Sequence, residues 1–168
     1  MIVDAVRLLL FPALMAFAAS SDLFTMTISN RVSLALTVGF FALALVMGMS
    51  LDEVAWHAGA GCAVLALTFG FFAFGWIGGG DAKLAAATAL WFGFGHLLDY
   101  AVYASLFGGV LTLLIIRFRV TPLPEKLAQQ PWVQRLHRCD GGVPYGIALA
   151  AAALVVYPDT SWMHALTL

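Results

Sequence analysis

Residues 82–118 read AKLAAATALWFGFGHLLDYAVYASLFGGVLTLLIIRF, and this stretch decides how many times the chain crosses a membrane. A membrane-spanning helix needs about 20 mostly apolar residues to cross roughly 30 Å of hydrocarbon. The stretch has 37 residues, which is too long for one crossing and long enough for two. Glycine and a polar ring interrupt it at Gly93, Gly95 and His96. We therefore predict one helix over Ala82–Gly95 and another over Leu98–Phe118.

The composition of the whole chain points to a membrane as its solvent. Of the 168 residues, 62% are hydrophobic and 10% are charged; the net charge is −1 and the mean hydropathy is +0.96. A soluble domain of this size cannot hide so much apolar surface in one core. These values exclude an ordinary soluble enzyme and a disordered chain, and two cysteines are too few for a disulfide scaffold. The near-neutral charge gives no reason to expect nucleic acid as a partner.

The remaining apolar stretches predict a single all-α domain over residues 1–168, a polytopic bundle of six transmembrane helices with both termini outside. The four further spans are Ile2–Ala19, Val32–Met49, Val54–Trp76 and Val143–Tyr157. The first also fits a signal peptide, since Ala18-Ala19-Ser20 resembles a cleavage site, but Asp4 offsets Arg7 at its start.

Basic residues set the predicted orientation. With six crossings, seven of the eight fall on one side, which is then the cytoplasm. They are Arg31, Lys83, Arg117, Arg119, Lys126, Arg135 and Arg138. Only Arg7 falls on the other side. Merging the fourth and fifth helices would move five basic residues across the membrane, which favours the six-helix interpretation.

The polar segment 119–142 has two interpretations. Trp132, Val133 and Leu136 lie among polar residues and suggest a short amphipathic turn on the membrane surface. A solvated basic loop that fixes the topology fits equally well. The five tryptophans fall mostly near predicted interfaces, as an aromatic belt would.

Two acidic residues stand out because both are predicted at the cytoplasmic membrane face. Asp22 follows the first span, and Asp81 opens the fourth span directly after Gly78-Gly79-Gly80. Three glycines allow a sharp turn and a close approach of another segment. Two carboxyl groups in a partly dry site share one proton, so that one activates water while the other protonates a scissile carbonyl. The simpler interpretation is that both aspartates only cap helices or lie at the interface.

The motifs around these aspartates resemble those of a known family. Gly78-Gly79-Gly80-Asp81-Ala82-Lys83-Leu84 is similar to the GxGD signature of membrane aspartic proteases, in the form found in prepilin peptidases. The segment 22–31, DLFTMTISNR, resembles the first motif of that family, and Val143-Pro144-Tyr145-Gly146 resembles the entrance to its last helix. The resemblance covers essentially the whole chain and is closest to the short prepilin peptidases of Flp/Tad-type pilus systems.

The resemblance implies an aspartic endopeptidase that removes the leader peptide of type IV, Flp-like prepilins at the cytoplasmic face of the inner membrane. Asp22 and Asp81 would be the catalytic pair. The residues that would shape the site are Gly78, Gly80, Asn30, Lys83, Pro144 and Tyr145. No metal or cofactor is expected, and the partners would be pilin-like precursors and membrane lipids. The oligomeric state stays open.

The sequence also departs from the family pattern. Ser29 stands where the first motif usually has proline, which would stiffen the entry to the second helix. Longer members carry a cysteine-rich zinc region and methylate the new pilin N-terminus. Because no Cys-x-x-Cys pair occurs here, we expect proteolysis without methyltransferase activity.

Two other classes of function remain open from the sequence. Buried carboxylates also serve proton or cation relays in small transporters and channels. A non-catalytic subunit of a pilus or secretion assembly is the second alternative. No Ser–His pair, HExxH or Walker-type loop points to another mechanism.

Overall fold

The structure, a computed structural model, describes residues 2–164, and no strand occurs among them. In chain order its helices are α1 (Ile2–Thr25), α2 (Asn30–Val46), α3 (Leu51–Ala73), α4 (Gly79–Phe92), η1 (Phe94–His96), α5 (Leu97–Val120), α6 (Glu125–Ala128), α7 (Pro131–His137), α8 (Tyr145–Val156), η2 (Tyr157–Asp159) and α9 (Ser161–His164). The six predicted apolar segments correspond to α1–α5 and α8, so the predicted all-α membrane bundle is confirmed.

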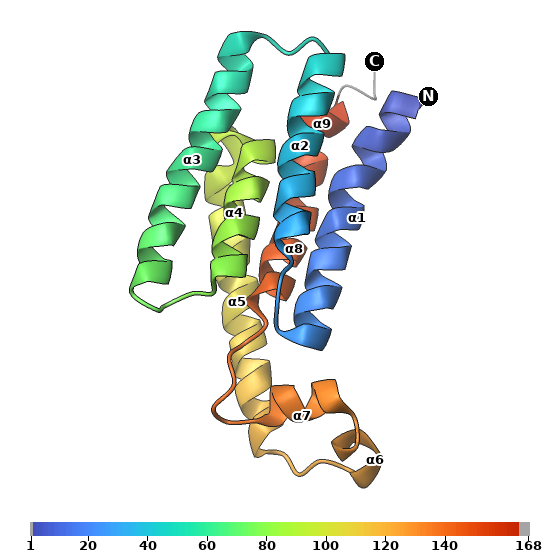
Figure 1. The fold of residues 1–168 in the computed structure, drawn as a ribbon, viewed down its shortest axis with the longest axis vertical. Coiled ribbons are helices and arrows are strands. Elements are labelled where there is room, and N and C mark those ends of the chain that lie inside the picture. The colour runs from blue at the N-terminus through green and yellow to red at the C-terminus, as the bar shows by residue number, and fades with distance from the viewer. Residues whose placement is uncertain (1, 165–168) are drawn as a thin grey trace.

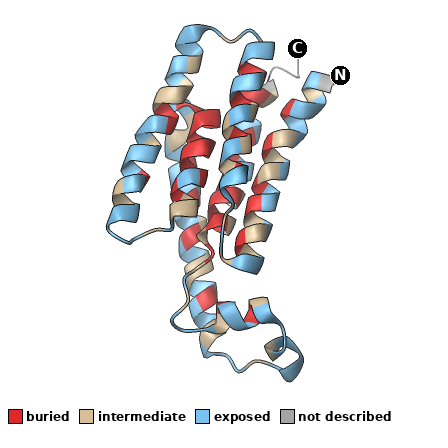
Figure 2. Cartoon of the chain, in the orientation of Figure 1, coloured by how far each residue is buried: buried red, intermediate tan, exposed pale blue. Residues whose placement is uncertain are grey.

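The helices pack around α4. Helices α2, α3 and α8 contact α4 directly, while α1 packs on α2 and α8, and α5 packs on α8 (Figure 1). Every residue from Leu84 to Phe92 is buried, and Figure 2 shows this helix as the most buried part of the bundle. α5 continues beyond the other helices and carries α6 and α7 at its end (Figure 1).

Among the described residues, three helices are long and apolar enough to cross a membrane: Val3–Thr25, Leu51–Ala73 and Phe94–Val120. α4 has only 14 residues, a rise of about 21 Å at 1.5 Å per residue. A helix that other helices surround does not face lipid, so its length need not match the hydrocarbon thickness. The break within residues 82–118 lies where we predicted it, at Gly93 (φ 60°) and the short turn η1.

Local signals explain where the helices start. Ser50 and Glu53 form a capping box at the start of α3. Ser29 is the N-cap of α2, and its hydroxyl accepts a hydrogen bond from the Arg31 N–H at 3.3 Å. The serine that replaces the usual proline of the first motif therefore stabilises the helix start by capping instead of by ring rigidity.

Two tryptophans lie in the core and not at an interface, which corrects part of the predicted aromatic belt. Trp91 and Trp162 are 0% and 2% exposed. The indole N–H of Trp91 donates to the Leu36 carbonyl at 2.9 Å, and that of Trp162 donates to the Trp91 carbonyl at 2.7 Å. A buried indole needs such a partner, and here the core supplies it.

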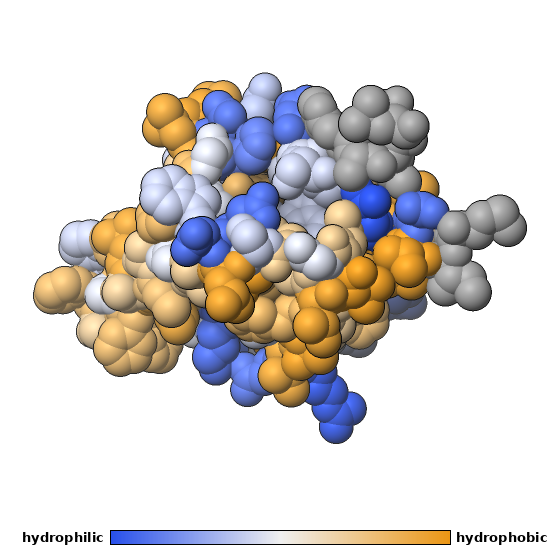
Figure 3. All heavy atoms as spheres, turned by 90° about the horizontal axis from the view of Figure 1, so that it is seen from above, coloured by the Kyte–Doolittle hydropathy of each residue, from blue (hydrophilic) through white to orange (hydrophobic). Residues whose placement is uncertain are grey.

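The outer wall of the bundle is apolar. Leu45, Leu51 and Leu98 are 83%, 86% and 75% exposed, and they belong to a large set of exposed hydrophobic side chains. Figure 3, an end-on view, shows hydrophobic side chains along the sides and hydrophilic ones gathered on the end. Such a surface suits lipid and would be a liability in water.

The segment after α5 folds back onto the protein. Arg119 donates hydrogen bonds to the carbonyls of Leu136, Gly141 and Gly142 at 2.9, 2.9 and 2.7 Å. Val133 and Leu136, the apolar side of α7, are buried inside the protein. α7 lies where the short amphipathic turn was predicted, but its apolar side packs against protein, since α7 contacts α5 and α1.

Candidate active site

Asp22 and Asp81 line the same small cavity, at the end of the bundle where α1 finishes and α4 begins. The cavity has a volume of about 280 Å³. Its other lining residues are Met26, Thr27, Ile28, Gly78, Gly79 and Gly80. The structure thus brings together two aspartates that are 59 positions apart in the chain. We call this cavity the aspartate cavity, and this end of the bundle the aspartate end.

Asp22 lies in the last turns of α1, because that helix continues past its predicted end at Ala19 to Thr25. Asp22 is 5% exposed. The backbone N–H of Gly146, at the start of α8, donates to Oδ2 of Asp22 at 2.8 Å. A carboxylate near a helix C-terminus is disfavoured by the helix dipole, and burial adds a further cost. Asp22 is therefore not a helix cap, and local structure does not account for it.

Asp81 lies in the first turn of α4 and is half-buried. The N-cap residue of α4 is Gly78, and Asp81, three positions later, accepts a hydrogen bond from the Gly78 backbone N–H. Oδ2 of Asp81 lies 2.9 Å from the point that a Cβ on Gly78 would occupy. A side chain at position 78 would move the carboxyl group from this place, so Gly78 leaves room for it.

Gly80 allows the turn before Asp81 to approach the segment after Asp22. A Cβ on Gly80 would lie 3.2 Å from Cβ of Ile28 and 3.5 Å from its backbone nitrogen. The predicted shaping roles of Gly78 and Gly80 therefore have a steric reason: together they seat the Asp81 turn against the loop that leaves α1.

The remaining predicted residues lie close to the aspartate cavity without lining it. Nζ of Lys83 donates to Oδ1 of Asn30 at 2.9 Å, which joins α4 to the start of α2. Pro144 is the buried N-cap of α8. Tyr145 points toward α5, where its hydroxyl lies 2.0 Å from the position of a Cβ on Gly108. Pro144 and Tyr145 thus anchor the start of α8 and leave the contact with Asp22 to the next residue.

Two residues of the site were not singled out from the sequence. Gly146 supplies the N–H that holds Asp22, and a Cβ there would lie 2.8 Å from Oδ2 of Asp22 and 2.6 Å from Cδ1 of Ile28. Ile28 packs against both Gly80 and Gly146. Gly146 stood in a quoted motif, but no sequence signal shows that α8 packs against the end of α1.

Metal ligands are not grouped in the part of the chain that the structure describes. Among residues 2–164, no three His, Cys, Asp or Glu side chains are placed to hold a metal ion. The chemistry that this arrangement offers comes from two carboxyl groups in one small cavity. Two such groups cannot both carry a charge at low cost, and a shared proton relieves the repulsion.

Comparison with known proteins identifies the family. Searches of curated proteins and of solved structures found no match. The family model described as the type IV leader peptidase family matches residues 9–113, a segment that contains both Asp22 and Asp81. Since this match covers more than half of the 168 residues, the chain belongs to the type IV leader peptidase family.

Proposed function

We propose that this membrane peptidase is an aspartic endopeptidase whose catalytic pair is Asp22 and Asp81. The observation that carries the proposal is their meeting in one cavity of about 280 Å³. Helix capping does not explain Asp22, which lies near the C-terminal end of α1. An ionisable residue at membrane depth marks a functional site by default.

The geometry supports a mechanism in which one water is the nucleophile. One carboxylate accepts a proton from that water as it attacks the scissile carbonyl carbon. The other carboxyl group donates its proton to the carbonyl oxygen, which gives a tetrahedral gem-diol. On its collapse the first carboxyl group passes the proton from water to the leaving nitrogen, and the second takes back a proton from a hydroxyl group of the gem-diol, so the pair again holds one proton. Oδ2 of Asp22 accepts the Gly146 N–H, and this hydrogen bond orients the carboxyl group in the cavity.

The substrate and the side of the membrane follow from the family and from the charges. We propose that the enzyme removes the leader peptide of Flp-like type IV prepilins at the cytoplasmic face of the inner membrane. Lys83 and Arg31 lie in the first turns of α4 and α2, and Arg119 in the last turn of α5, all at the aspartate end. Cytoplasmic ends of membrane helices are rich in such residues. With Cys62 and Cys139 as the only cysteines, the product is expected to be unmethylated.

The test is co-expression of a Flp-type prepilin with the wild type, Asp22→Asn and Asp81→Asn, with precursor and product separated on gels. Each variant is expected to lower the processing rate by about 10²–10⁴-fold, the usual contribution of a positioned acid or base. Asp52→Asn is the matched control, because it removes an exposed carboxylate at the start of α3, away from the cavity. Normal processing by a folded Asp22→Asn or Asp81→Asn would show that the pair is not catalytic. That result is the one expected if the protein is a non-catalytic subunit. Product mass reports methylation in the same samples.

A further inference from the structure

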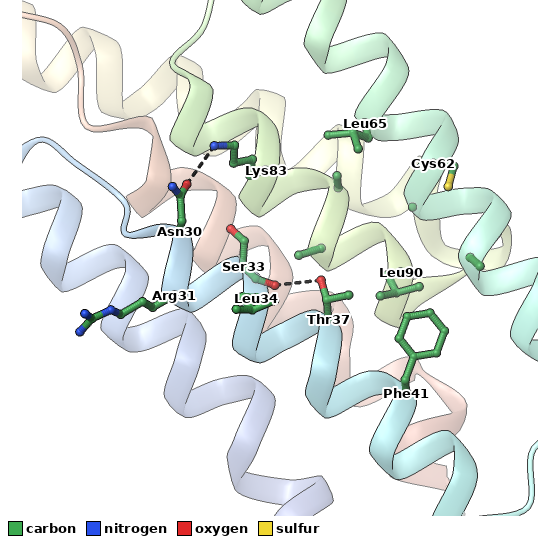
Figure 4. Close-up of a pocket in the computed structure, with 14 residues that line it drawn as sticks. Asn30, Arg31, Ser33, Leu34, Thr37, Phe41, Cys62, Leu65, Lys83 and Leu90 are labelled. Atoms are coloured by element: carbon green, nitrogen blue, oxygen red, sulfur yellow. Dashed lines mark hydrogen bonds between the residues drawn. The ribbon is translucent and has the colours of Figure 1, made fainter.

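A second, larger cavity opens on the side of the bundle between α2 and α3. It has a volume of about 580 Å³ (Figure 4). Leu34 and Phe41 line it from α2, Leu65 and Cys62 from α3, and Ala87 and Leu90 from α4. We call it the α2–α3 groove. Leu34, Phe41 and Leu65 are 63%, 44% and 45% exposed, so its walls offer apolar surface that no segment of the described chain covers.

The groove exists because α2 and α3 each pack on α4 and hardly on each other. The short side chains of Ala86 and Ala87 form its floor. On α3, Gly61 approaches α4 closely, since a Cβ there would lie 3.2 Å from Cβ of Leu90. Small residues are what membrane helices present to another helix that packs closely.

The length of the groove suits a helix. Its lining on α2 runs from Asn30 to Phe41, and the eleven steps between these two residues rise about 16 Å at 1.5 Å per residue. A guest helix would contact it over about three turns of 5.4 Å each. The hydroxyl groups of Ser33 and Thr37 interrupt an otherwise apolar lining. Its charged and amide side chains lie at the aspartate end, where Asn30 and Lys83 are joined by their hydrogen bond (Figure 4).

The groove begins near the aspartate cavity, although no described residue lines both. Lys83 follows Asp81 by two positions on α4, and Asn30 follows Ile28 by two positions before α2. Two residues of helix rise about 3 Å but turn by about 200°, so Asp81 and Lys83 lie on different sides of the start of α4, and a guest chain passes around that turn to reach the aspartates. A chain that leaves the groove at Lys83 therefore needs a few extended residues, at about 3.3–3.6 Å each, to reach the aspartate cavity.

We infer that the α2–α3 groove docks the hydrophobic helix of the precursor, with the residues just ahead of that helix extending past Asn30 and Lys83 to the aspartate pair. This inference rests on the proposed function, because it assigns the docking site of that same substrate. Its occupant is a single apolar helix in the bilayer, and its depth in the groove sets which peptide bond meets Asp22 and Asp81.

Cys62 provides a direct test, since it is exposed and lines the groove. In the full-length Cys139→Ser, Asp81→Asn chain, which is expected to retain the precursor uncut, single cysteines are placed along the first eleven positions of the precursor helix. Oxidation should form disulfides to Cys62 at positions on one helical face, spaced three or four residues apart. The matched control moves the cysteine to the neighbouring, outward side of α3, as Cys62→Ala with Ala63→Cys, and should cross-link at least about tenfold less.

The outcomes separate the groove from the catalytic proposal. Suppose that the wild type processes the precursor, but Cys62 forms no disulfide or positions 62 and 63 form disulfides equally. This result would contradict docking in the groove and would leave the proposed catalysis by the aspartate pair unaffected. That result is also expected if lipid alone fills the groove. Periodic disulfides at Cys62 with no processing by the wild type would uphold docking and overturn the proposed catalysis.

A second variant pair tests the same inference by activity. Thr37→Trp fills the groove from α2, at a distance along the chain from both aspartates. It is expected to lower the cleavage rate at limiting precursor by about tenfold or more, the low end of what a steric mismatch costs in an apolar pocket. Val38→Trp, at an exposed position outside the groove, should process normally. Equal rates for the two variants, in chains that both fold, would contradict the inference.

Discussion

Asp22 shows how a single residue can work against its local structure. It lies in the last turns of α1, 5% exposed, where both the helix dipole and burial oppose a carboxylate. Its partner from the chain is the N–H of Gly146, which comes from α8 at 2.8 Å. A residue that its own helix disfavours, and that a second helix holds in place, is typical of a functional site.

Gly146→Ala tests how Asp22 is positioned. The new Cβ would lie 2.8 Å from Oδ2 and 3.2 Å from Cβ of Asp22, so the carboxyl group must move. A displacement of about 1 Å in a catalytic group lowers a rate by about a hundredfold, and we expect a loss of processing of that size. Gly109→Ala is the control, because nothing lies within 4 Å of its Cβ. Equal processing by both variants in the prepilin assay would contradict the positioning role of Gly146.

Helix α4 illustrates the element scale. Its 14 residues are too few to span the hydrocarbon, yet Leu84–Phe92 are all buried by neighbouring helices. Being short allows its first turn, with Asp81, to lie in a cavity at the aspartate end. The triglycine turn is what makes this possible, because Gly78 and Gly80 each face an atom that a side chain would strike.

The segment between α5 and α8 depends on Arg119, and Arg119→Ala is expected to release it. Three hydrogen bonds to the carbonyls of Leu136, Gly141 and Gly142 would be lost. Bonds to a charged group contribute about 1.5–3 kcal/mol each as an upper range, so local unfolding should become easier by several-fold at least. Limited proteolysis of the purified protein would measure this as faster cleavage within residues 121–143.

Arg117→Ala is the matched control for that experiment. Arg117 is exposed, lies two residues earlier on the same helix, and its side chain makes no hydrogen bond or ion pair with the described residues. Its variant should be cleaved at the wild-type rate. Cleavage that accelerates equally in both variants would mean that charge near the membrane, and not the Arg119 contacts, protects the segment.

At the scale of the whole molecule, the orientation of the bundle decides which compartment the aspartate pair serves. We expect Cys139, in the loop before α8 at the aspartate end, to be cytoplasmic. A membrane-impermeant maleimide should label Cys139 in a Cys62→Ala chain only after spheroplasts are lysed. An Asp52→Cys chain lacking both native cysteines should be labelled in intact spheroplasts, since Asp52 is exposed at the opposite end. The reverse pattern would overturn the proposed orientation.

Much of this architecture follows from the sequence because a membrane imposes simple rules. Backbone groups in hydrocarbon must be paired within a helix, so each long apolar run predicts a helix. That rule located α1–α5 and α8, and the glycines within residues 82–118 predicted the break at Gly93. The motifs around Asp22 and Asp81, and the family that they resemble, could also be recognised without any tertiary contact.

The tertiary structure decided what no local pattern encodes. Hydropathy does not show whether an apolar side chain faces protein or lipid, because both environments are apolar. It therefore could not place Trp91 or the apolar side of α7 inside the protein. The contact of the Gly146 N–H with Asp22 joins residues 124 positions apart, and the α2–α3 groove arises from two helices that pack on a third. The sequence by itself determined the solvent, the helices and the two aspartates. Packing between distant helices brought those aspartates into one cavity and left the groove beside them.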